Sequence, residues 1–449
     1  MEPDTQGAVK RQLGFWTVLA LVMGNVIGSG VFLIPAQLAP YGWNAIFGWI
    51  VTIAGCLCLA YVFASLARAL PKAGGPYAFT RAAFGEGTGF AVAWSYWISV
   101  WTANAAIAIA AVSYLGLVAP GLSDTPWLPP LLAISLVWAL TLVNCLSIRA
   151  VGGVQLVTTV IKLLPLVAAI GITLAVTATG GASTAPPLSA SDITFGAVAA
   201  TATLTLWTMV GFESATVPAG RVRDPERIVP RATLIGTAAV GLIYLVACSG
   251  VALLLPQEVA ADSGSPFADF ADRYLGSGVA LAVGLCAVVS ALGALNGWVL
   301  IQGDLPLALA RDGVFPRWFA AVTRAGTPLR AQIVASTLVS LLIAANADRT
   351  IGGLFVFMAL LSTSVTLFTY LICSMAALKL RDEGVLAPSA MLVPAAILGL
   401  AYSLGTIYGA GLEAAKWAAA LLLSGIPVWL AMRLFRRAGE EAAPPESRA

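Results

Sequence analysis

The chain has 449 residues, of which 59% are hydrophobic and 10% are charged, and its formal net charge is +3. Soluble domains carry about 25% charged residues, so this composition indicates a polytopic membrane protein and excludes a soluble enzyme or a nucleic-acid-binding domain. The absence of histidine excludes imidazole-based catalysis, proton relay and metal binding. The six cysteines lie in apolar segments, without zinc spacing or a disulfide framework, so neither a metal nor a cofactor is expected.

The first apolar segment follows a short polar tail over residues 1–12, which carries no cleavable signal, so the first helix is expected to stay in the membrane. Its centre is the glycine-rich run Met23–Phe32, read Met-Gly-Asn-Val-Ile-Gly-Ser-Gly-Val-Phe. Each glycine costs a helix interior about 1 kcal/mol relative to alanine, and an unpaired backbone group in hydrocarbon costs several kcal/mol. The run therefore indicates a helix broken beside a binding cavity or, alternatively, a close contact between helices.

Apolar stretches of about 20 residues are long enough to cross a bilayer, and the chain contains twelve of them. With the N-terminus in the cytoplasm, only three of the 24 lysines and arginines fall in external loops, namely Arg273, Arg349 and Lys416. The positive-inside rule therefore predicts twelve spans with both termini cytoplasmic. The predicted spans are about 15–39, 43–67, 87–119, 127–147, 151–177, 193–220, 231–255, 277–309, 330–346, 351–378, 388–409 and 412–435.

A second break is predicted in the sixth span, where Gly211 and the ionisable Glu213 lie at mid-span within Leu206–Ala215. The breaks in spans 1 and 6 occupy equivalent positions in two sets of five helices. Because an odd number of helices separates corresponding members, the two sets have opposite topology. Two matched breaks favour a secondary transporter over simple helix packing.

These residues, with further motifs along the chain, resemble the amino acid–polyamine–organocation (APC) transporters, most closely the arginine/agmatine antiporter and the basic amino acid/polyamine exchangers. The matching motifs are Gly24–Phe32, Gly74–Tyr77, Ala82–Gly85, Leu206-Trp207, Gly211–Ala215, Asp224–Arg227, Val229-Pro230, Gly297-Trp298 and Asp312–Pro316. The resemblance implies an all-α polytopic membrane protein with twelve transmembrane helices in a LeuT-like fold. The implied parts are a tail (1–12), two inverted five-helix repeats (13–180 and 190–380), helices 11 and 12 (386–436) and a cytoplasmic tail (437–449).

The resemblance also implies how an amino acid is held. Its carboxylate is expected at backbone amides after the first break, where free N–H groups and the helix dipole favour an anion. Its ammonium is expected at carbonyls freed by both breaks, with one tryptophan closing over the substrate and another stacking on a guanidinium, for which an indole is the best cation–π partner. The substrate-binding residues implied in this way are Ile27, Ser29, Gly30, Ser99, Asn104, Trp207, Val210, Trp298 and Ser362.

Gating and proton coupling are implied at four further residues. An outer closure of two tyrosines and a glutamate matches Tyr96, Glu213 and Tyr370, and a buried carboxylate can be neutralised by a proton. Lys162 of span 5 resembles the lysine that replaces sodium in proton-coupled APC members, so its ammonium is expected to face carbonyls near the first break. A lysine near mid-bilayer costs about 2.5–3.5 kcal/mol on insertion scales; the alternative is that it snorkels to the cytoplasmic interface.

Several positions depart from the arginine antiporter. Val100 and Ile107 stand where that protein has a thiol and a thioether against the guanidinium, and Ser99 replaces a small apolar residue. These changes favour a different, even neutral, side chain in the substrate. Asn104 has a second interpretation as a polar contact between helices.

Together these patterns predict a secondary transporter of the inner membrane that exchanges arginine, another basic amino acid or a polyamine by alternating access. One alternative is a proton-coupled permease for neutral amino acids, and another is a membrane sensor that binds an amino acid without moving it. An intramembrane enzyme is disfavoured because the chain has no histidine, no paired carboxylates and no metal cluster. The expected partners are a small-molecule substrate, the lipid bilayer and, as a coupling ion, protons; the sequence leaves a homodimer open.

Overall fold

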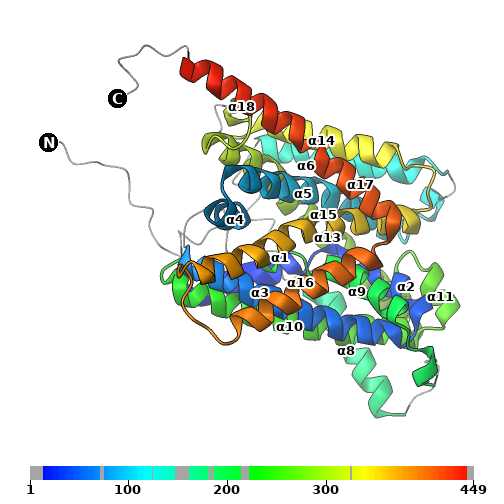
Figure 1. Ribbon diagram of the computed structural model, residues 1–449. Coiled ribbons are helices and arrows are strands. Elements are labelled where there is room, and N and C mark those ends of the chain that lie inside the picture. Colours follow the sequence, from blue (N-terminus) through cyan, green and yellow to red (C-terminus); the bar gives the residue numbers. More distant parts are fainter. Residues whose placement is uncertain are drawn as a thin grey trace.

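The computed structural model describes residues 14–70, 75–123, 125–146, 161–180, 184, 187–213, 222–323 and 326–441. The tail 1–12, the first part of segment 151–177, the end of segment 193–220 and residues 442–449 lie outside the described residues. The described part is all-helical (Figure 1). Its longer helices are α1 (Phe15–Val26), α3 (Asn44–Ala69), α4 (Pro76–Phe84), α5 (Glu86–Leu115), α6 (Leu128–Leu146), α8 (Leu163–Ala178), α9 (Phe195–Met209), α10 (Pro225–Leu254), α12 (Pro266–Leu275), α13 (Ser277–Arg311), α14 (Leu329–Ala344), α15 (Ile351–Asp382), α16 (Leu392–Gly409), α17 (Gly411–Leu423) and α18 (Gly425–Glu441).

Short helices connect these elements. The shorter segments are η1 (Ser29–Phe32), α2 (Ile34–Leu38), η2 (Ala39–Tyr41), η3 (Pro120–Ser123), η4 (Ala190–Asp192), α11 (Gln257–Asp262) and η7 (Arg317–Ala320). The chain between α1 and α2 therefore runs through a single 3₁₀ turn, which interrupts the first predicted span.

Eight helices of the described chain are long and apolar enough to cross a membrane, and four shorter ones, α1, α8, α9 and α14, are also apolar. Each of these helices overlaps a different one of the twelve predicted segments. In the segments with predicted breaks, α1 ends at Val26 and α9 ends at Met209. Helices α1 and α9 are therefore short because each ends at a break that the sequence predicts.

The helices pack in two groups. In one group α10 packs against α1 and α3, and α3 packs against α9; in the other, α5, α6, α13 and α14 pack against one another. The long helix α15 contacts α5 as well as α3 and α9, so it lies between the groups. The two interrupted segments belong to the first group, and the site lies where that group faces α5 and α15.

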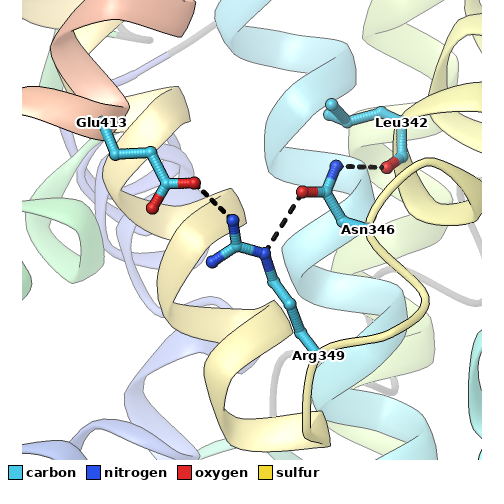
Figure 2. Close-up of polar contacts among 4 residues, drawn as sticks. All are labelled: Leu342, Asn346, Arg349 and Glu413. Atoms are coloured by element: carbon cyan, nitrogen blue, oxygen red, sulfur yellow. Dashed lines mark hydrogen bonds and ion pairs between the residues drawn. The ribbon is translucent and has the colours of Figure 1, made fainter.

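A polar cluster fixes the start of α17 to the connection between α14 and α15 (Figure 2). The Arg349 guanidinium donates to Asn346 Oδ1 at 3.2 Å, forms an ion pair with Glu413 and lies 4.3 Å from the centre of the Phe357 ring. Asn346 in turn donates to Leu342 O at 3.0 Å. An exposed ion pair is worth about 0–1 kcal/mol, so this cluster orients α17 more than it stabilises the fold.

Candidate functional site

The first break lies at Ile27, directly after α1. Its backbone has φ −73° and ψ 82°, and Gly28 N donates to Val26 O at 2.7 Å, which is the geometry of an inverse γ-turn. The turn diverts the chain from helix into η1. Tyr244 of α10 donates its hydroxyl to the same Val26 carbonyl at 3.0 Å, so a side chain from the neighbouring helix satisfies a backbone group near the break.

The second break lies at Val210 and Gly211. Val210 is extended (φ −60°, ψ 137°), and Gly211 has φ 118°, a conformation that side chains rarely adopt. Gly211 N donates to the Glu213 carboxylate at 3.1 Å and is thereby diverted from the carbonyl of Trp207, its partner in a continuing helix. A Cβ atom at Gly211 would lie 3.1 Å from Asn25 O. The two breaks therefore touch each other.

A cavity of about 40 Å³ lies beside the two breaks. Its walls come from the first interrupted segment, α5, the end of α9, α13 and α15. The lining residues are Asn25, Val26, Gly28, Gly30, Val31, Tyr96, Ser99, Ala103, Ile107, Trp207, Thr208, Val210, Trp298, Ser362 and Thr366. A water molecule takes about 30 Å³ in the liquid, so a cavity of this volume is too small for an amino acid. The structure therefore shows the site in a closed form.

Trp207 covers the cavity at the start of η1, where the chain continues after the first break. A Cβ atom at Gly30 would lie only 1.8 Å from the Trp207 ring, so glycine is required where the ring rests on the backbone. The ring also contacts Phe355 edge-on, with 5.3 Å between ring centres. The two serine hydroxyls of the wall are already used, since Ser362 Oγ donates to Ser99 O at 2.9 Å and Ser99 Oγ donates to Tyr96 O at 2.8 Å.

Most of the predicted binding residues gather at this cavity. Gly30, Ser99, Trp207, Val210, Trp298 and Ser362 line it. Ile27 forms the turn beside it, and Ser29 begins η1. The sequence interpretation overlooked Ala103, Thr208 and Thr366. Helical spacing was the available signal, because Ala103 and Thr366 each follow a predicted residue by four positions and so share its face.

Asn104 differs from the prediction because it does not line the cavity. Its Nδ2 donates to Gln302 Oε1 of α13 at 2.8 Å, and Gln302 Nε2 donates to Ser336 Oγ of α14 at 2.9 Å. The side chain is fully buried in this network. In this closed form Asn104 therefore joins α5 to the helices behind it, which was the alternative interpretation. Val100 of the predicted departures is also absent from the lining, whereas Ile107 is present.

Glu213 accepts hydrogen bonds from both predicted tyrosines. Tyr370 OH donates to Oε2 at 2.9 Å and Tyr96 OH donates to Oε1 at 3.5 Å. All three residues are buried, so the carboxylate is held by directed donors from α5, α15 and its own backbone. The cluster therefore joins the chain just after the second break to α5 and α15.

The position of this cluster along α5 and α15 bears on the side of the cavity that it closes. Tyr96 precedes the other cavity residues of α5 and lies toward its Glu86 end, while Tyr370 follows those of α15 and lies toward Lys379 and Arg381. The positive-inside rule assigns that end to the cytoplasm. In the orientation that the charges predict, the cluster would therefore lie on the cytoplasmic side of the cavity, whereas the sequence interpretation made it an outer closure.

Lys162 precedes α8 and is buried. Its Nζ donates to Gly24 O at 2.8 Å, one turn before the first break. The side chain thus points into the protein toward α1, where the sequence predicted its partner, instead of extending to an interface.

Paired helix breaks around a buried, tryptophan-lined cavity are typical of a membrane transporter. A family model described as amino acid permease matches residues 13–416. The chain therefore belongs to the amino acid permease family, which confirms the predicted APC resemblance and makes the protein a transporter and not an enzyme.

Its relatives include named antiporters. The chain is 35% identical over 354 residues to the cadaverine/lysine antiporter of Escherichia coli (strain K12), covering 76% of this chain and 77% of that protein. It is 31% identical to a putative arginine/ornithine antiporter of Bacillus subtilis (strain 168), covering 83% and 85%. It is also 29% identical to the putrescine transporter PotE of Escherichia coli (strain K12), covering 83% and 84%.

Proposed function

We propose that the protein exchanges basic amino acids or polyamines across the cytoplasmic membrane by alternating access. The observation that carries this proposal is the meeting of the two helix breaks, Gly211 against Asn25, at a cavity lined by Trp207 and Trp298. The printed names of the relatives support the substrate class, because lysine, cadaverine, arginine, ornithine and putrescine are all cationic.

The proposed binding mode follows from the backbone groups. A substrate carboxylate would lie at the amides of η1 near Gly30, at the positive end of a short helix. The Trp207 ring now covers that position, so this ring must swing away for the substrate to enter and can return over it. A side-chain cation would lie against the Trp298 indole.

The proposed architecture has twelve spans in two inverted repeats, 13–180 and 190–380, with both termini in the cytoplasm. The packing supports a moving group and a static group of helices, since α1, α3, α9 and α10 form one group and α5, α6, α13 and α14 form another. The first group would move against the second. Glu213 with its tyrosines would close the cytoplasmic path, and Lys162 would hold α1 where sodium-coupled relatives of the fold place an ion.

Counterflow into proteoliposomes tests the proposal. Vesicles loaded with unlabelled arginine, lysine, ornithine, agmatine, cadaverine or putrescine should take up labelled substrate, while empty vesicles should not. Uptake without internal substrate that follows an imposed pH gradient would instead favour proton-coupled transport. Binding without any uptake would favour a sensor.

A second candidate, a proton-coupled permease for neutral amino acids, is favoured by one observation. Ile107 lines the cavity, and none of the described residues that line it carries a charged side chain. The same vesicles loaded with leucine or alanine decide between the candidates, because a cationic exchanger leaves these substrates unmoved.

A further inference from the structure

Two further cavities lie at the edge of the molecule, apart from the proposed transport site. The larger cavity, of about 460 Å³, lies between α4, the start of α5, the turn after α13 and α18. A neighbouring cavity of about 270 Å³ is lined by apolar residues of α5, α17 and α18. Gly87, Phe90 and Trp429 line both, so the two form one continuous surface with a polar end and an apolar end.

The polar end carries charges of both signs. Arg81 donates to Tyr77 OH at 2.9 Å and to Glu86 at 3.0 Å, so it is engaged within the wall. Arg433 stacks on Trp429, with its guanidinium carbon 5.3 Å from the ring centre. Among the described residues, neither Arg433 nor Asp312 takes part in an ion pair, and both line the cavity. One cation and one anion thus remain available to a ligand.

The apolar end faces the predicted lipid. Trp94 donates its indole N–H to Leu421 O at 3.1 Å, and a Cβ atom at Gly425 would lie 2.6 Å from its ring, so α5 fixes the junction of α17 and α18. Helix α18 runs along the upper margin of the molecule (Figure 1), and only 11% of the apolar stretch within Gly411–Leu434 is buried. Ile426, which lines the apolar cavity, is half exposed.

We propose that this surface binds a zwitterionic phospholipid with a primary amine, of the phosphatidylethanolamine type. Its phosphate would pair with Arg433, its ammonium with Asp312, and an acyl chain would lie along Phe90, Trp94 and Ile426. Guanidinium and phosphate form strong charge-assisted hydrogen bonds, and the basic residues put this end at the cytoplasmic headgroup level. A soluble zwitterion would leave the apolar cavity uncovered, which is why the surface fits a lipid.

Native mass spectrometry of the full-length protein tests the site. The protein, released from detergent, is titrated with dioleoyl phosphatidylethanolamine, phosphatidylcholine or phosphatidylglycerol. We expect the ethanolamine lipid to be retained most, because choline offers no N–H donor to Asp312 and glycerol offers no cation. Arg433→Gln and Asp312→Asn should each lower this retention by about five- to tenfold, as loss of one charge-assisted contact implies.

Arg330→Gln provides the matched control. Arg330 of α14 also stacks on a tryptophan, Trp318, at 5.1 Å, but it lines neither cavity. This variant should retain the lipid as the wild type does. Thermal melting of all variants without added lipid checks that each is folded.

Three outcomes overturn the proposal. Equal or stronger retention of phosphatidylglycerol would mean that the site selects anionic charge alone. Equal loss in Arg330→Gln would make the effect non-specific. Displacement of the lipid by free lysine at millimolar concentration, or by a second protein copy in a lipid-free dimer, would assign the surface to another occupant.

Discussion

Lys162 Nζ lies 2.8 Å from the carbonyl oxygen of Gly24 and ties the start of α8 to α1 one turn before the first break. The contact is buried, and its donor is the lysine ammonium, a group that can lose its charge. It joins the segment with the break to a helix outside it, so its presence or absence can bias the movement of α1.

Lys162→Ala should slow exchange more than it weakens substrate binding. Loss of a hydrogen bond from a charged group costs about 1.5–3 kcal/mol, which corresponds to about tenfold or more in rate. Proteoliposome turnover and equilibrium binding measure the two effects separately. Since a second cation near the ammonium would be repelled, wild-type exchange should be equal in sodium and choline buffers. Sodium-stimulated uptake, or full activity of Lys162→Ala, would contradict this role.

Glu213→Gln should flatten the pH dependence of transport while leaving substrate binding intact. The carboxylate accepts from Tyr370, Tyr96 and Gly211 N, whereas an amide keeps one acceptor oxygen and cannot ionise. Initial exchange rates between pH 5 and 8, taken for both proteins, measure the change. Tyr370→Phe is the control, because it removes one donor and keeps the carboxylate. An unchanged pH profile in Glu213→Gln would remove this residue from coupling.

The sequence predicted the breaks well and the side-chain partners less well. Glycine runs such as Gly24–Gly30 have a local cost in a membrane helix, so they indicate a break without knowledge of the fold. Asn104 was different, because an amide can face a ligand or another helix. Successive helical residues differ by about 100°, so Asn104 points away from the stripe of Ser99, Ala103 and Ile107.

The partner of Asn104 could not be predicted. Gln302 is 198 positions away on α13, and only the packing of α5 on α13 brings the two amides together. The Lys162 contact was more predictable, since a lysine within an apolar segment needs an acceptor and the first break offers backbone carbonyls.

Gly211→Ala should destabilise the protein in detergent. Its φ of 118° is unfavourable for alanine, and the new Cβ would lie 3.1 Å from Asn25 O, so we expect a cost of about 1–3 kcal/mol. Gly405→Ala is the matched control, because Gly405 lies within α16 with no atom within 4 Å of its Cβ position. The control should gain about 0.5–1 kcal/mol. Thermal melting should therefore shift down for the first variant and up for the second; equal shifts would contradict the assigned geometry.

Asp269 of α12 gives a pH dependence of stability outside the membrane. Burial raises the pKa of this carboxyl, while the hydrogen bond from Ser263 opposes the shift. A raised pKa in the folded state means that ionisation at neutral pH disfavours folding, and that this penalty disappears as pH falls through the folded pKa. Asp269→Asn should therefore melt higher than the wild type at pH 7.5, with a smaller difference at pH 4.5. If the melting temperature of Asp269→Asn relative to the wild type instead rises on acidification, the hydrogen bond from Ser263 outweighs burial in setting the pKa of Asp269.

Trp298→Leu distinguishes the substrate classes. Trp298 and Ile107 both line the cavity and give it one aromatic and one aliphatic wall residue. An indole stabilises a desolvated cation by about 1–2 kcal/mol. Arginine or lysine should then bind about five- to thirtyfold more weakly to the variant, while an aliphatic amino acid should be little affected because leucine keeps an apolar contact. Trp298→Phe, which keeps a weaker aromatic face, should lie between the two. Isothermal titration of all three proteins with arginine, lysine, cadaverine and leucine gives the series. Unchanged arginine affinity in Trp298→Leu, or tight binding of leucine alone to the wild type, would assign the cavity to neutral amino acids, because an aliphatic side chain gains no charge-dependent stabilisation from the indole.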